Sequence, residues 1–378
     1  MKNGGIMNRD SVYKKLYKRL TVTLTGIPKG GKLLEILEVL FTIEEAEMAL
    51  ILPFMPAPVS DIADGAGMDI EDAKRVLSNM ADKGLVYAFE RRGGTQMFML
   101  FSVVWTLFKF PFMTDDIPGL DYERLISLCD EFLAEYPLVE GPSVPEGKHF
   151  PLDRVLPINE SLSMKSEVLP HDSVYQYFDD AKYISVGECA CKRIVGDCDS
   201  PTEVCMSFDY EAKFLAERKM ARLINKEEAK TIHKMATDAG LVSVTSNTKD
   251  KVNFLCHCCP CCCALLGVAT RHGLYDLAPK GAYIASVKQD ECTACGLCEE
   301  TCPMKAIEIN DTAQINIERC IGCGLCVLSC TTGALSLIKR TPTPDVPKDI
   351  IELTKKVVET RGIAKEFLEE LKVKKKVE

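Results

Sequence analysis

Cysteine placement constrains this chain more than any other feature of its sequence. The 378 residues include nineteen cysteines. Eighteen of them fall between Cys189 and Cys330, and only Cys129 lies outside that stretch. One spacing, C-x2-C-x2-C-x3-C, occurs twice, first at Cys292, Cys295, Cys298 and Cys302 and then at Cys320, Cys323, Cys326 and Cys330. Chance does not produce such a repeat, so the fold around residues 292–330 must serve whatever these thiols bind.

The chemistry of iron explains the repeated spacing. A [4Fe-4S] cubane needs four thiolates that converge from different directions, and tight C-x2-C turns bring three of them to one face of the cluster. Gly296, Gly322 and Gly324 allow backbone conformations that side chains would resist in these turns. Zinc at the eight cysteines is the alternative, but the repeat is the known pattern for cluster binding. We therefore predict two [4Fe-4S] clusters as cofactors.

Residues 286–338 resemble the bacterial two-cluster ferredoxins. The resemblance includes the apolar sequences MKAIEIN and TGALSLI, which follow the two motifs. It implies that each motif gives its fourth cysteine to the other cluster. The implied ligand sets are Cys292, Cys295, Cys298 and Cys330 for one cluster, and Cys320, Cys323, Cys326 and Cys302 for the other. Thr331 departs from the pattern, because the family usually has proline after the last cysteine.

Ten further cysteines form a second, less familiar pattern in the middle of the chain. They are Cys189, Cys191, Cys198 and Cys205, followed by Cys256, Cys258, Cys259, Cys261, Cys262 and Cys263 in the run CHCCPCCC. Adjacent cysteines cannot easily form an unstrained disulfide with each other, so metal or cluster ligation is the better interpretation. The pattern favours one or two further iron–sulfur clusters, with zinc and a redox dithiol as alternatives.

The whole arrangement resembles a group of 4Fe-4S ferredoxin-type proteins of anaerobic microbes, known as redox proteins without an assigned substrate. Three residues beside the central cysteines are candidates for a role at the metal or cluster site. His257 is either a ligand or proton donor, or a histidine that happens to lie in a tight loop. Lys192 and Arg193 either offset the negative charge of a thiolate-ligated cluster or lie on the surface.

The N-terminal part, residues 1–113, is predicted to be a winged-helix-like domain. Apolar periodicity indicates a helix in LLEILEVLF and a second one capped by Thr42. Ser60 and Asp69 are expected to cap two more helices, and a hairpin follows around Arg91 and Arg92. The helix after Asp69 carries three basic and four acidic residues up to Lys83, which is a poor surface for a phosphate backbone. Docking or packing is favoured over DNA binding.

The rest of the chain completes an α+β fold. We expect a connecting region at 114–182 with a helix over 122–136, a cysteine-rich module at 183–285 and the ferredoxin-like domain at 286–338. Asn225 is expected to cap a helix that Gly240 ends, and two strands, LVSVTS and KVNFL, lead into Cys256. Residues 339–378 are predicted to be a charged, solvated C-terminal helix, and Cys129 a buried structural thiol.

Composition narrows the class of protein further. The net charge of −9, from 46 basic and 55 acidic residues, argues against non-specific nucleic-acid binding. The start of the chain has no apolar run typical of a signal peptide, so the cytoplasm is the expected location. The apolar stretch 97–113 carries Lys109 and Pro111 and is expected to be buried rather than to span a membrane.

These features together predict an iron–sulfur electron-transfer protein. It would pass low-potential electrons between a redox protein partner, two [4Fe-4S] clusters and the central cysteine-rich site. Catalytic residues cannot be named, because Rossmann, phosphate-loop and serine-nucleophile motifs are all missing from the sequence. One alternative is a reductase, an oxidoreductase component with a substrate-binding cluster in the central module. The other is a redox-sensing winged-helix regulator.

Overall fold

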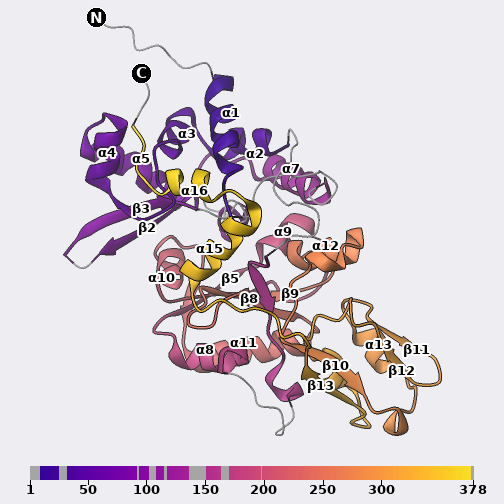
Figure 1. The fold of residues 1–378 in the computed structure, drawn as a ribbon. Helices are drawn as coiled ribbons and strands as arrows, with labels where there is room; N and C mark the ends of the chain where they lie inside the picture. Colours follow the sequence, from indigo (N-terminus) through magenta and orange to yellow (C-terminus); the bar gives the residue numbers. More distant parts are fainter. Residues whose placement is uncertain are drawn as a thin grey trace, which may run out of the picture. The chain divides into compact units, whose positions relative to one another are not determined.

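The chain divides into two compact units, which we describe separately. The first comprises residues 1–149 and 355–378, and the second comprises residues 150–354. The structure, a computed structural model, describes residues 9–24, 32–91, 93–101, 108–114, 117–135, 150–162, 170–196 and 198–375 (Figure 1). Both units combine helices with antiparallel sheets, which confirms the α+β class. Residues 114–182, expected as a connecting region, contribute to both units.

The first unit is mainly helical. Its elements are α1 (Arg9–Leu20), α2 (Lys32–Leu40), α3 (Ile43–Ala49), β1 (Ala57–Pro58), α4 (Val59–Ala66), α5 (Ile70–Asp82), β2 (Val86–Arg91), β3 (Thr95–Leu100), η1 (Phe110–Met113) and α7 (Tyr122–Glu135). Thr42 and Asp69 cap α3 and α5 as predicted, and Thr42 forms a full capping box with Glu45. The predicted cap at Ser60 is wrong. The rigid backbone of Pro58 stands at the start of α4, and Val59 is already helical.

A three-stranded sheet in the order β1-β3-β2 completes this unit, and its β2–β3 hairpin lies where the wing was expected. Arg92, one of the two arginines expected at the hairpin tip, lies outside the described residues, as does part of the apolar stretch 97–113. Cys129 is fully buried within α7, which confirms the predicted structural thiol. Among the described residues, no helix is long and apolar enough to cross a membrane.

The prediction of one solvated C-terminal helix is wrong. The segment forms α15 (Ile350–Arg361) and α16 (Ala364–Glu370), which are separated at Gly362 with φ of 67°. Phe367 is 4% exposed and its ring lies 5.8 Å from that of Phe54. Arg19 donates to Glu370 over 2.6 Å in a buried ion pair. Apolar side chains of this charged segment are therefore buried in the core of the first unit. The composition of the segment alone does not indicate this burial.

The second unit is built on a six-stranded antiparallel sheet in the order β4-β8-β9-β6-β5-β7. Its strands are β4 (Asp153–Val155), β5 (Ile184–Glu188), β6 (Glu203–Phe208), β7 (Arg222–Ile224), β8 (Val242–Ser246) and β9 (Phe254–Cys258). Its helices are η2 (Asn159–Ser161), η3 (Pro170–Asp172), α8 (Val174–Asp180), α9 (Ala190–Val195), α10 (Asp209–Glu217), α11 (Lys226–Asp238), α12 (Ala264–His272) and η4 (Tyr275–Leu277). Asn225 caps α11 and Gly240 follows its end in the left-handed conformation, as predicted.

The two faces of this sheet are covered differently. Figure 1 shows α8 and α11 on one face, and α9 and α12 on the other. Strand β9 runs through Cys258, three residues beyond the expected end at Leu255, and successive side chains along it lie on opposite faces of the sheet. Leu255 packs with the α8–α11 core, while Cys256 and Cys258 join the core beneath α12.

The ferredoxin-like part consists of two small sheets and two short helices. Its elements are β10 (Tyr283–Val287), η5 (Gln289–Glu291), α13 (Leu297–Thr301), β11 (Ile307–Ile309), β12 (Ala313–Ile315), α14 (Leu325–Ser329) and β13 (Leu335–Lys339). Strand β10 pairs with β13 and β11 pairs with β12, both antiparallel. Its core is continuous with that of α12 and the adjacent strands. This part is therefore packed onto one face of the central sheet.

Candidate metal centres

The two ferredoxin-like motifs have the same local structure. In each, a left-handed glycine precedes a short helix, and the last cysteine of the motif ends that helix. Gly296 and Gly324 have φ of 84° and 87°, values that residues with a side chain rarely adopt. Cys302 ends α13 and Cys330 ends α14. The glycine turns the chain so that the third thiol of each motif returns toward the first two.

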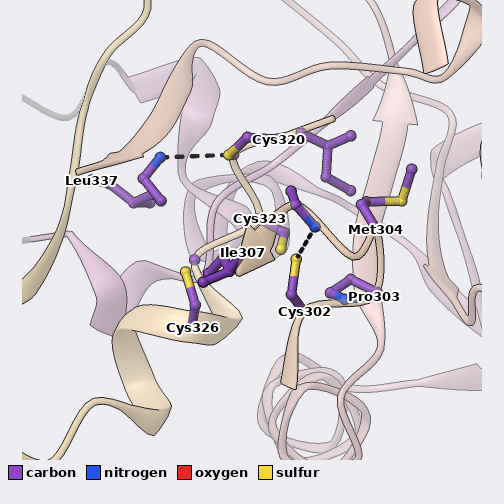
Figure 2. Close-up of a pocket in the computed structure, with 13 residues that line it drawn as sticks. Cys302, Pro303, Met304, Ile307, Cys320, Cys323, Cys326 and Leu337 are labelled. Atoms are coloured by element: carbon purple, nitrogen blue, oxygen red, sulfur yellow. Dashed lines mark hydrogen bonds between the residues drawn. The ribbon is translucent and has the colours of Figure 1, made fainter. Parts of the chain in front are cut away.

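One cavity brings together thiols from both motifs. It is lined by Cys302 of the first motif and by Cys320, Cys323 and Cys326 of the second. Figure 2 shows their sulfur atoms arranged around a common space. Backbone N–H groups point at two of them: Ala306 donates to Cys302 over 3.3 Å, and Ala285 of β10 donates to Cys320 over 3.5 Å. The remaining lining is mainly apolar.

The donor set of this cavity fits a cluster. Four thiols, N–H donors aimed at sulfur and an apolar wall are the environment that thiolate-ligated iron–sulfur clusters require. Burial raises the pKa of Cys323 to about 12, and it raises the pKa of Cys326 further. Thiols buried in this way ionise when positive charge is supplied, and coordinated iron would supply it.

The second ferredoxin set is closer to solvent. Cys298 is buried, Cys292 is half-buried and Cys295 is exposed. The thiols of Cys292 and Cys295 act electrostatically on Cys298, whose pKa is raised chiefly by burial. Ala313 donates its N–H to Cys292 over 3.4 Å. Cys330, the predicted fourth member, is half-buried and contacts the hydroxyl of Thr332 at 3.6 Å. Its assignment to this set stays a prediction.

Nine of the ten central cysteines fall into two groups. The four-thiol group contains Cys198, Cys259, Cys261 and Cys262, whose sulfur atoms all lie within 4.8 Å of one another. Cys198 comes from the loop between α9 and β6, and the other three come from the turn that follows β9. Burial acts to raise the pKa of Cys198, but hydrogen bonds from Ser200 and neighbouring thiols lower it to about 7. The group thus holds a negative charge readily.

The five-thiol group lies at the starts of α9 and α12 and on β9. Its members interact in a closed series: Cys189 with Cys191, Cys191 with Cys263, Cys263 with Cys258, Cys258 with Cys256, and Cys256 with Cys189. Hydrogen bonds from Cys191 and Cys258 lower the pKa of Cys263 to about 6, despite its burial. Cys205, buried on β6, is assigned to neither group.

A buried lysine accompanies these groups. Lys192 is 4% exposed, and its ammonium donates to the carbonyl of Pro201. Among the described residues, no carboxylate lies within ion-pair distance of it. A buried cation without an anionic partner is costly. An anionic, thiolate-ligated centre beside Lys192 would supply that partner, which favours the first of the two roles considered for this residue.

His257 does not face these thiols and is not positioned to bind a metal together with them. Its side chain lies on the opposite face of β9 from Cys256 and Cys258, and both ring nitrogens are engaged. Nδ1 bonds to the carbonyl of Val204 over 2.7 Å, and Nε2 lies 2.9 Å from Nδ1 of His233 on α11. Burial lowers the pKa of His257 to about 4 and that of His233 to about 3, so both are neutral at pH 7. The pair is part of the core.

Comparison with known proteins identifies one part of the chain. Residues 291–334 match the sequence model of the 4Fe-4S dicluster domain family. This is an iron–sulfur protein. The match spans about an eighth of the chain and contains both cysteine motifs. No curated protein and no solved structure matches the chain significantly. The central groups are thus described by their geometry alone.

Two features of these sites had only a weak signal in the sequence. The division of the run CHCCPCCC between two groups depends on the residue at which β9 ends, which periodicity did not fix. Ser161 lies against Gly324 of the second motif, 163 positions further along the chain, and local sequence patterns do not indicate so distant a contact. Lys192 carried a signal, a basic residue beside a C-x-C pair, but its burial did not follow from it.

Proposed function

We propose that this protein transfers electrons between a redox partner and the central five-thiol group by way of two [4Fe-4S] clusters. Cys302, Cys320, Cys323 and Cys326 would hold one cluster, and Cys292, Cys295, Cys298 and Cys330 the other. When bound, such clusters supply reversible one-electron transfer. The observation that carries the proposal is the common cavity of Cys302 and the three cysteines of the second motif. It matches the exchange of fourth ligands in two-cluster ferredoxins.

The solvent-facing set is suited to meet the partner. Cys295 is exposed and Leu297 beside it is 40% exposed. Exposed carboxylates flank this surface at Asp290, Glu299 and Glu300. An apolar spot with an acidic rim favours a redox protein whose docking surface is basic, because opposite charges steer the encounter.

The buried set faces the central module. The backbone N–H of Ile158 donates to the carbonyl of Cys323 over 3.0 Å, and Gly281 donates to Ile321 over 2.8 Å. Cys258 and Cys263 of the five-thiol group belong to the same continuous core as Cys320 and its neighbours. These contacts support electron transfer from the ferredoxin-like part into the central module, since they hold the two in a fixed arrangement.

A reductase is the second candidate function. The five-thiol group offers one thiol more than a cubane has irons, so each iron of such a cluster could have a thiolate ligand. A substrate would reach an iron only by displacing one of these thiolates. A redox-sensing regulator is less well supported. On α5, Arg75 pairs with Glu44 over 3.0 Å, and Lys83 at its end pairs with Glu45 over 2.8 Å. These cations are already neutralised within the unit.

The test is to remove thiols one at a time and follow the clusters. Anaerobically purified protein is expected to contain at least eight irons with matching sulfide. Cys302→Ala and Cys320→Ala should abolish the same EPR signal, while Cys298→Ala should abolish the other. Cys129→Ala, which removes a buried thiol of the first unit, is the control and should change neither signal. If Cys302→Ala and Cys298→Ala instead affect one signal together, each motif holds its own cluster and the proposal is wrong.

A further inference from the structure

The four-thiol group differs in its dimensions from the ligand set of an iron–sulfur cluster. Three of its sulfur pairs lie in contact: Cys198 and Cys259 at 3.7 Å, Cys198 and Cys262 at 3.6 Å, and Cys261 and Cys262 at 3.7 Å. These sulfurs are too far apart for disulfides, whose S–S bond is about 2.05 Å. All four cysteines are free thiols.

We propose that Cys198, Cys259, Cys261 and Cys262 bind one tetrahedral divalent metal ion, Zn²⁺ or a single Fe²⁺, without inorganic sulfide. Four sulfurs about 2.3 Å from one tetrahedral ion lie about 3.8 Å from each other. The thiolates of a cubane lie outside a core of four irons and are therefore roughly 6 Å or more apart. Contacts of 3.6–3.7 Å match the mononuclear geometry and are too short for a cubane.

The same chain supplies an internal comparison. Elsewhere in the described part of the chain, no group of three or more potential ligands has all its ligand atoms within 4.8 Å. The thiols around the ferredoxin-like cavity are thus more widely spaced, as a cubane requires. Neighbouring thiols of the five-thiol group also form hydrogen bonds in pairs, but no three of its sulfur atoms all lie within 4.8 Å of one another. Mutual proximity of all four sulfur atoms, rather than contact within single pairs, distinguishes the four-thiol group.

The local backbone is also that of a mononuclear thiolate site. Cys259 and Cys262 form a C-x2-C pair, a spacing typical of structural zinc sites. The N–H of Cys262 donates to Sγ of Cys259 over 3.4 Å, which stabilises the thiolate within the turn. Cys259 is 2% exposed and Cys262 is fully buried. The group contains no histidine or carboxylate, and an all-sulfur tetrahedral set selects zinc or iron.

The position of Cys198 suggests what the ion does. This residue lies in the loop that leaves α9, 61 positions before Cys259. A metal held by both would fasten this loop to the turn between β9 and α12. The starts of α9 and α12 carry Cys189, Cys191 and Cys263 of the five-thiol group. The ion would thus fix the two segments that present the neighbouring site.

Metal analysis of the full-length protein tests this. After anaerobic purification, zinc, iron and acid-labile sulfide are measured per chain. We expect about one metal ion that is not matched by sulfide, as zinc or as iron in excess of sulfide. Cys261→Ala should remove this ion and leave the iron and sulfide of the ferredoxin-like clusters unchanged. Cys189→Ala, which removes a thiol of the five-thiol group, is the matched control and should retain the ion.

Two results would overturn the proposal: a wild-type protein with no unmatched metal ion, or loss of about four irons with four sulfides in Cys261→Ala. X-ray absorption at the zinc edge, or Mössbauer spectra if the unmatched metal is iron, cover the case in which that variant does not fold. Zinc in wild-type protein should show four sulfur neighbours at about 2.3 Å and no metal neighbour, and a single Fe²⁺ should give a Mössbauer component separate from the cluster irons. Nitrogen or oxygen neighbours would contradict the assignment. The EPR signals of the same wild-type sample report separately on the proposed electron-transfer function.

Discussion

The contact between Ser161 and Gly324 tests how the ferredoxin-like part is fixed to the central module. Gly296 and Gly324 occupy equivalent positions in the two motifs, with φ of 84° and 87°. A Cβ on Gly296 would meet nothing within 4 Å, whereas one on Gly324 would lie 2.7 Å from Cβ of Ser161 in η2. Real Cβ atoms do not approach other atoms more closely than 3.0 Å. Alanine at position 324 must therefore displace the η2 segment.

The magnitude follows from the two contributions. The left-handed backbone costs an alanine about 1–2 kcal/mol at either position. Overpacking against Ser161 adds about 1–3 kcal/mol at position 324 only. We expect Gly324→Ala to lower the free energy of unfolding of the second unit by that additional amount relative to Gly296→Ala. The corresponding difference in Tm is about 2–4 °C for each kcal/mol in a unit of this size.

The assay is thermal unfolding of anaerobically purified protein at a fixed scan rate, with the iron content measured in each sample. The double variant Ser161→Gly/Gly324→Ala removes the clash and should return Tm to within the range of Gly296→Ala. Equal destabilisation by the two single alanine variants would refute the reasoning. So would a double variant no more stable than Gly324→Ala.

Three further predictions concern charges. Arg340 donates to the carbonyl of Cys320 over 2.7 Å, so Arg340→Gln should lower the reduction potential of the buried cluster by on the order of tens of millivolts; an unchanged redox titration would contradict this. His233 has a folded-state pKa of about 3, so the unfolded chain binds more protons below pH 6.5, and the contribution of His233 to the free energy of unfolding should fall by about 1 kcal/mol between pH 7.5 and 5.5. Urea titrations should show this fall reduced in His233→Gln, and an equal fall would exclude His233 as its source. Glu370→Ala leaves Arg19 buried and unpaired, so it should destabilise the first unit by about 3 kcal/mol; a midpoint within error of wild type would show that the pair contributes little.

Local signals in the sequence predicted local structure well. Thr42, Asp69 and Asn225 each accept a backbone N–H at the helix start where they were expected. Such caps depend on residues within three positions, which the sequence places side by side. The repeated cysteine spacing is similarly local, and a known family of domains shares it.

Features that depend on tertiary packing were harder to predict. The ten central cysteines were expected to hold one or two further clusters, but the sequence did not show which cysteines belong together. Strand β9 ends at Cys258, and this places Cys256 and Cys258 in one group and Cys259 in the other. One residue of strand length decides that division, and alternation alone does not set it. The burial of Phe367 likewise depends on Phe54, which lies more than 300 positions away in the sequence.

The pairing of Arg19 with Glu370 also orders the events of synthesis. These residues are 351 positions apart, so at 5–20 residues per second roughly 20–70 s separate their emergence from the ribosome. All eighteen cysteines of the second unit emerge within that interval. The unit that binds metal can thus be complete while the first unit still lacks its last helix. The N-terminal unit, although its first residues are translated first, cannot complete its contacts until α16 has been synthesised.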